Sequence, residues 1–139
     1  MGLDLYMGKR TPEGASDDEI ETIAQTNVHL FGTGYGTFAA TRRVIADMEG
    51  IDLDTMDGFG GTKDWDEVDS PIKPLLNHSD CDGHLTRAEC AAMTARMQEI
   101  NDLAPGTLPE LIRLRLEELT NAIASVGVAP DDDTYLIFA

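Results

Sequence analysis

Apolar residues alternate with polar ones near the start of the chain and gather again at its end. Residues 2–7 (GLDLYM) show the two-residue period of a half-buried strand. Residues 134–139 (TYLIFA) are rich in β-branched and aromatic side chains, which suit a buried strand. We therefore predict that these two segments pair as a short two-stranded sheet.

Between these segments, apolar residues recur at the spacing of amphipathic helices. A first helix is expected over about 17–31, because Ser16 followed by Glu19 is the pattern of a capping box. Further helices are expected over about 38–48, 87–103 and 108–126. The predicted fold class is α+β and mainly α-helical, with about four helices in one domain that comprises residues 1–139.

Three stretches between these elements are expected to be turns or loops. The glycine-rich segment 31–36 (FGTGYG) is expected to separate the first two helices. Residues 51–73 contain many acidic residues and the tryptophan Trp65, and are expected to form a long structured loop. Residues 131–133 (DDD) are expected to form a turn before the last strand.

The charge of the chain narrows the range of partners. Twenty-six acidic residues against ten basic ones give a net charge of −16, which repels nucleic acid and favours cations and basic partners. No run of 18 apolar residues is present, and the first residues lack a signal-peptide pattern. We expect a cytoplasmic protein that contacts neither membrane nor nucleic acid directly.

The most informative motif is an EF-hand-type calcium loop over residues 78–89. Gly83 matches the glycine at position 6, which places Asp80 at position 3, Asp82 at position 5 and Glu89 at position 12. Calcium is a hard cation that takes six to eight oxygen ligands, so closely spaced carboxylates suit it. The sequence predicts an EF-hand-like loop and helix at about 77–103.

The remaining loop positions refine this interpretation. His84 at position 7 needs to supply only its backbone carbonyl, and Leu85 at position 8 would anchor the loop on the core. His78 stands at position 1, where aspartate is usual. We expect calcium to be held by Asp80, Asp82, Glu89 and the His84 carbonyl, with water or another oxygen completing the shell.

The same residues allow two other interpretations. His78, Cys81, His84 and Cys90 offer four nitrogen or sulfur donors of the kind that bind Zn²⁺. Alternatively, the segment is a turn that caps the next helix and holds no metal. The carboxylates and Gly83 favour calcium over zinc, because zinc requires neither.

A weaker candidate is an anion site between the first two helices. Gly34 and Gly36 precede a helix that carries Arg42 and Arg43, and a helix N-terminus favours negative charge. This pattern lacks the Walker lysine and the full spacing of a phosphate-binding loop, so a simple turn between helices is the favoured interpretation. No catalytic constellation stands out, so an enzyme is not predicted.

The opening GLDLY and the string HSDCDG, here residues 78–83 with Cys90 after them, resemble a family of small uncharacterised proteins from actinobacteria and their phages. The resemblance covers about a quarter of the chain. It implies that His78 is a regular occupant of loop position 1, and it brings no particular activity.

Three functions are therefore expected in order. The first is a small acidic calcium-binding domain that acts as a structural or interaction module. The second is a phage-type protein that sequesters a small anionic nucleotide ligand at the glycines and arginines. The third is an acidic mimic of nucleic acid that binds a basic protein.

Overall fold

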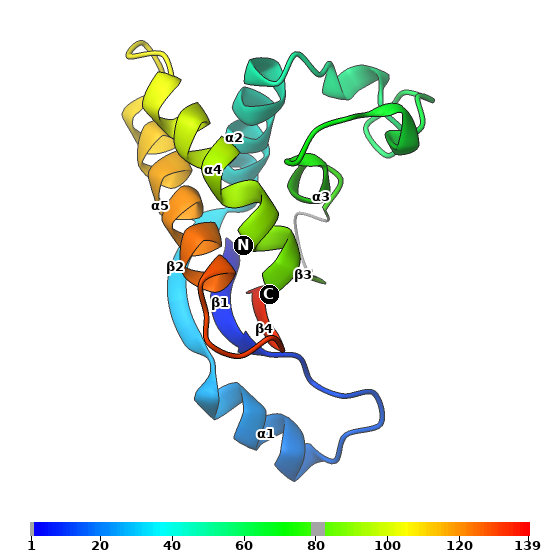
Figure 1. The fold of residues 1–139 in the computed structure, drawn as a ribbon, viewed down its shortest axis with the longest axis vertical. Helices are drawn as coiled ribbons and strands as arrows, with labels where there is room; N and C mark the ends of the chain where they lie inside the picture. The colour runs from blue at the N-terminus through cyan, green and yellow to red at the C-terminus, as the bar shows by residue number, and fades with distance from the viewer. Residues whose placement is uncertain (1, 79–82) are drawn as a thin grey trace.

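The computed structural model describes residues 2–78 and 83–139, and its elements are shown in Figure 1. The strands are β1 (Gly2–Lys9), β2 (Val28–Gly34), β3 (Gly83–Thr86) and β4 (Thr134–Phe138). The helices are α1 (Asp17–Thr26), α2 (Tyr35–Met48), α3 (Lys73–Leu76), α4 (Arg87–Leu103) and α5 (Glu110–Gly127). Two short 3₁₀ helices, η1 (Leu53–Thr55) and η2 (Trp65–Glu67), lie between α2 and α3.

The four strands form one antiparallel sheet in the order β2-β1-β4-β3. Strand β1 pairs with β4, with Leu5 opposite Phe138, as predicted for the two end segments. Asp4 and Ala139 extend the pairing by exchanging two backbone hydrogen bonds of 2.9 Å. The expected fold of about four helices and a two-stranded sheet is nevertheless wrong, since the described residues form five helices and four strands.

The structure differs from the predicted fold in residues 27–36, which were expected to end a helix and form a turn. The helix begins after Ser16, whose hydroxyl accepts a hydrogen bond from the Glu19 backbone N–H at 3.2 Å, but it ends at Thr26 instead of residue 31. Residues 28–34 form β2, in which Phe31 and Thr33 are buried on one face. The glycine-rich segment is therefore no break between helices, because it contains the end of β2 and the start of α2.

The core lies between one face of the sheet and the helices α2, α4 and α5 (Figure 1). Side chains from β1, β3 and β4 meet helical residues there, and the rings of Phe38 and Phe138 pack edge to face with centroids 5.9 Å apart. Helices α4 and α5 form a hairpin and pack along each other, while α1 has no buried residue and projects from one end of the molecule (Figure 1).

The segment 51–73 has the loop structure that was predicted. Apart from η1, η2 and the first residue of α3, it consists of turns and isolated β-bridges. Trp65 is buried within it, donates its indole N–H to the carbonyl of Asp57 at 2.9 Å, and packs edge to face against Phe59. These contacts pack the acidic segment on the hydrophobic core, of which Trp65 is a part.

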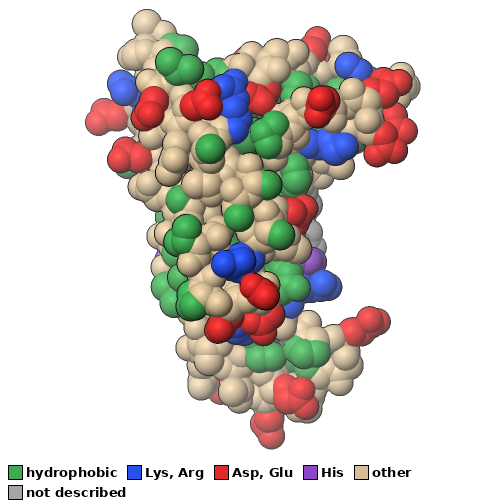
Figure 2. Space-filling view, viewed as in Figure 1, with side chains coloured by type: hydrophobic (Ala, Val, Ile, Leu, Met, Phe, Trp, Pro, Cys, Tyr) green, Lys and Arg blue, Asp and Glu red, His purple; other side chains and the backbone are tan. Residues whose placement is uncertain are grey.

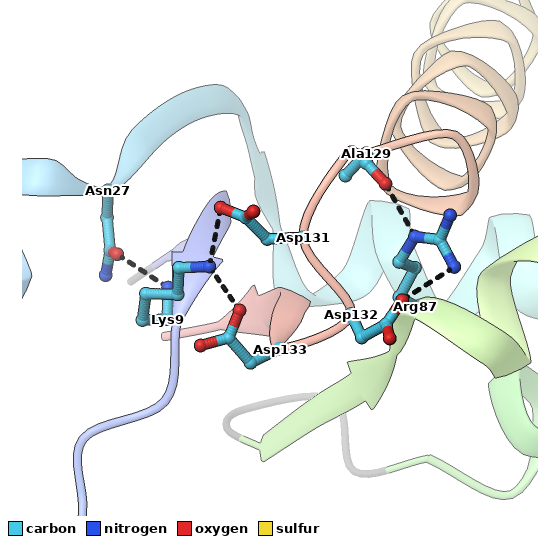
Figure 3. Close-up of polar contacts among 7 residues, drawn as sticks. All are labelled: Lys9, Asn27, Arg87, Ala129, Asp131, Asp132 and Asp133. Carbon is cyan, nitrogen blue, oxygen red and sulfur yellow. Dashed lines mark hydrogen bonds and ion pairs between the residues drawn. The ribbon is translucent and has the colours of Figure 1, made fainter.

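The three aspartates before β4 form the expected turn, and basic residues from two other elements hold it (Figure 3). The ammonium group of Lys9 on β1 pairs with Asp131 at 3.2 Å and with Asp133. The guanidinium of Arg87, the first residue of α4, donates to the carbonyl of Ala129 at 2.6 Å and pairs with Asp132 at 3.5 Å. Hydrogen bonding to Asp133 raises the pKa of Lys9 and lowers the pKa of Asp133.

No helix among the described residues has both the length and the apolar character needed to cross a bilayer.

The two faces of β4 predict unequal costs of truncation. Leu136 is fully buried opposite Leu85, whereas Ile137 is half-buried on the other face. We expect Leu136→Ala to lower the free energy of unfolding by about 3 to 5 kcal/mol, and Ile137→Ala to cost clearly less. Urea unfolding followed by Trp65 fluorescence measures both, and equal losses would contradict this assignment of the core face.

Candidate functional site

The predicted calcium loop lies between α3 and α4, beside the end of β4. Asp80, Cys81 and Asp82 lie outside the described residues, so the structure describes this site through His78 and the segment 83–89. Among the described residues, no group of three or more His, Cys, Asp or Glu side chains is placed to hold a metal.

Gly83 has a backbone conformation that favours glycine. Its φ angle is +111°, a region that side-chain-bearing residues rarely adopt. A Cβ atom added there would lie 3.0 Å from two atoms of the His78 ring. The backbone conformation therefore favours glycine, and a larger residue would also require the His78 ring to shift.

The second half of the loop is anchored to the sheet. Strand β3 pairs with β4, so that Gly83 lies opposite Phe138 and Leu85 lies opposite Leu136. Leu85 is buried in the core, as predicted for position 8. The four residues of β3 were not predicted as a strand, because so short a segment shows no clear period.

Glu89 and Thr86 form a complete capping box at the start of α4. The Thr86 hydroxyl accepts the Glu89 backbone N–H at 3.0 Å, and a carboxylate oxygen of Glu89 accepts the Thr86 backbone N–H at 2.9 Å. The carboxylate of Glu89 is thus turned back toward the loop, at the helix end where negative charge is favourable. This role was not predicted from the sequence, although the Thr-x-x-Glu spacing is its known signal.

His78 lies against the core side of the last strand. Its ring packs on the ring of Phe138, with centroids 4.1 Å apart and planes tilted by 34°. The imidazole therefore fills the space between Phe138 and Gly83. His78 at position 1 of the loop therefore has a packing role that does not depend on a bound metal.

His84 faces the other side of the sheet. Its ring packs edge to face on Tyr135 at 5.2 Å, and Tyr135 and Phe138 are three residues apart on one strand, so they point to opposite faces. Burial lowers the pKa of His84, and the nearby positive charge of Arg10 lowers it further. The structure thus holds His78 and His84 against opposite faces of β4.

Cys90, the last of the four predicted zinc ligands, is buried in the core. It is a free thiol with no exposed surface, and burial raises its pKa to about 12. Zinc binds cysteine as a thiolate, which this environment disfavours. Because His78, His84 and Cys90 are not brought together, the described part of the chain does not support a zinc site.

The residues of the predicted anion site are also separate. Gly34 is the N-cap of α2 and Gly36 lies in its first turn, whereas Arg42 and Arg43 come about two turns later. The guanidinium of Arg42 lies over the rings of Phe38 and Phe59, at 4.9 and 5.4 Å from their centroids.

Arg43 pairs with Asp54 of the acidic segment at 3.2 Å. Both arginines therefore support the packing of residues 51–73 on α2, and they do not surround the glycines.

Comparison with models of protein families, with curated proteins and with solved structures gives no match.

The environment of Cys90 predicts a thiol that reacts only when the protein unfolds. In a Cys81→Ser variant, which leaves Cys90 as the single thiol, we expect alkylation by iodoacetamide in step with global unfolding in urea. Mass spectrometry at a series of urea concentrations measures the modified fraction. Rapid modification without urea would show that Cys90 is accessible, contrary to its position in the core.

Proposed function

We propose that residues 78–89 bind a calcium ion as an EF-hand-like loop in a small acidic structural or interaction module. The main observation in support is the conformation of residues 83–89. In the register that the motif requires, they provide a glycine turn, a core-anchored strand and a capped helix start.

The proposed ligands are oxygens from four residues. Asp80 and Asp82 are assigned from the sequence alone, the His84 backbone supplies a carbonyl, and Glu89 supplies a carboxylate. Three carboxylates balance the charge of one calcium ion and leave an excess of one negative charge. The net charge of −16 favours a cation at any exposed site.

The affinity is expected to be lower than that of a loop with aspartate at position 1. Affinity for calcium rises with the number of charged ligands, and His78 contributes ring packing on Phe138 in that place. Calcium would act chiefly by joining residues 78–82 to the start of α4. Strand β4 and the Arg87 contacts already hold that helix start to the rest of the fold.

The competing interpretation is a capping turn without metal, and Glu89 distinguishes the two. Glu89→Gln keeps an amide oxygen that can accept the Thr86 N–H, but it removes the carboxylate charge. If the loop binds calcium, the variant should retain most of its stability without metal and lose most of its affinity for calcium.

We expect calcium at 100 times its dissociation constant to raise the unfolding free energy of the natural sequence by about 2.7 kcal/mol. Calorimetric titration and thermal melting of chelator-treated protein measure this, with magnesium and zinc in parallel. Asp82→Asn should weaken the response as Glu89→Gln does. Asp102→Asn, an exposed change at the far end of α4, is the matched control and should leave it intact.

The calcium assignment fails if the natural sequence shows no stabilisation by calcium, or if Glu89→Gln and Asp102→Asn respond to it equally. The capping-turn interpretation would then account for Thr86, Gly83 and Glu89 without an ion.

A further inference from the structure

The end of the α4–α5 hairpin, far from the loop, contains a groove of about 680 Å³. It lies between the C-terminal part of α4 and the N-terminal part of α5. Ala104, Leu108, Leu114 and Leu116 line its apolar part, and Glu110 and Glu117 are among its polar residues. Its volume is in the range of known ligand-binding clefts, but it is open to solvent along one side.

Exposed leucines gather around this groove. Six large apolar side chains are exposed in the described chain, and three of them are at this end: Leu103 is 68% exposed, Leu111 48% and Leu114 46%. Leu111 and Leu114 are three residues apart and so lie on one side of α5. Figure 2 shows hydrophobic side chains at this end of the molecule, with acidic and a few basic side chains among them.

The fold itself does not require these leucines. Helix α5 contributes a separate stripe to the core, in which Leu116, Leu119, Ile123 and Val126 are buried. Leu111 and Leu114 lie outside that stripe. A cluster of exposed apolar residues without a role in the core is typical of an interaction surface.

The charges beside the groove are mainly negative. Arg96 is already paired with Glu49 and Glu99, and Arg115 is paired with Glu118 at 2.7 Å. In contrast, Glu110 and Glu117 in the groove form no ion pair among the described residues.

Arg113 is the only basic residue among those that line the groove. The surface therefore combines apolar side chains with carboxylates that are available to a basic partner.

We propose that this groove binds an amphipathic helix of a partner protein, with apolar residues on one face and lysines or arginines beside them. A helix laid in a groove makes contacts at positions i, i+3, i+4 and i+7, which suits a groove between two helices that has leucines and carboxylates in its lining. Carboxylates at the edge add specificity and speed association with a basic partner. This inference does not depend on calcium binding.

A second copy of the chain fits the surface less well. Three partly exposed leucines provide a few hundred square ångströms at most, whereas a stable interface buries about 800 Å² on each partner. Each copy also carries a net charge of −16, so two copies repel each other.

The probe is a synthetic 18-residue peptide of leucine and lysine with leucines at helical spacing, together with a scrambled peptide of the same composition. Calorimetric titration in the presence of chelator separates this test from the calcium site. We expect micromolar binding of the patterned peptide and at least tenfold weaker binding of the scrambled one. Binding should weaken further as salt rises, because the carboxylates contribute.

Matched variants locate the binding surface. The pair Leu111→Ser and Leu114→Ser should weaken binding about tenfold or more, whereas Val128→Ser, at an exposed apolar residue outside the groove, should not. Glu110→Gln with Glu117→Gln should weaken binding and reduce its salt dependence. Glu13→Gln with Glu21→Gln is the control of equal charge change near α1.

The proposal is overturned if the scrambled peptide binds equally well, since charge alone would then explain binding. It is also overturned if neither peptide binds, or if the control variants weaken binding as much as the groove variants. Analytical ultracentrifugation gives a further test. A dimer that dissociates in the Leu111→Ser and Leu114→Ser variant would identify a second copy as the occupant and would also overturn the proposal.

Discussion

The antiparallel pairing of β4 with both β1 and β3 is the contact on which the rest of the structure depends. Strand β4 lies inside the sheet and joins the first segment of the chain to the strand of the candidate loop. Its alternation decides which side chains enter the core, with Leu136 and Phe138 inward and Tyr135 and Ile137 outward. Through Phe138 and Tyr135 it also places His78 and His84 on separate faces.

The sequence predicted elements well where one pattern was strong and local. The helix over 87–103 has the predicted bounds, and the end strands pair as expected, because their side chains are clearly suited to a core. It failed for β2. The residues after Thr26 continue a helical spacing by chance, and only their pairing with β1 selects the extended form. Such long-range pairing is not readable from a local period.

The site shows the same division. Leu85 is buried and α4 begins at Arg87, both as predicted, because each depends on burial or on a local pattern. The capping role of Glu89 was readable from its spacing to Thr86 but was hidden by the metal interpretation. The contacts of Arg42 and Arg43 were not predictable, since they depend on where the irregular segment 51–73 folds back.

The position of β4 also has a consequence for how the protein is made. During synthesis this strand is the last described element to leave the ribosome. Strands β1 and β3 therefore cannot pair with β4 until the other described elements have been synthesised. Until then, the loop at 78–89 has no strand beside it and Leu85 has no opposite residue. We therefore expect this region to fold after the α4–α5 hairpin, whose contacts are close in sequence.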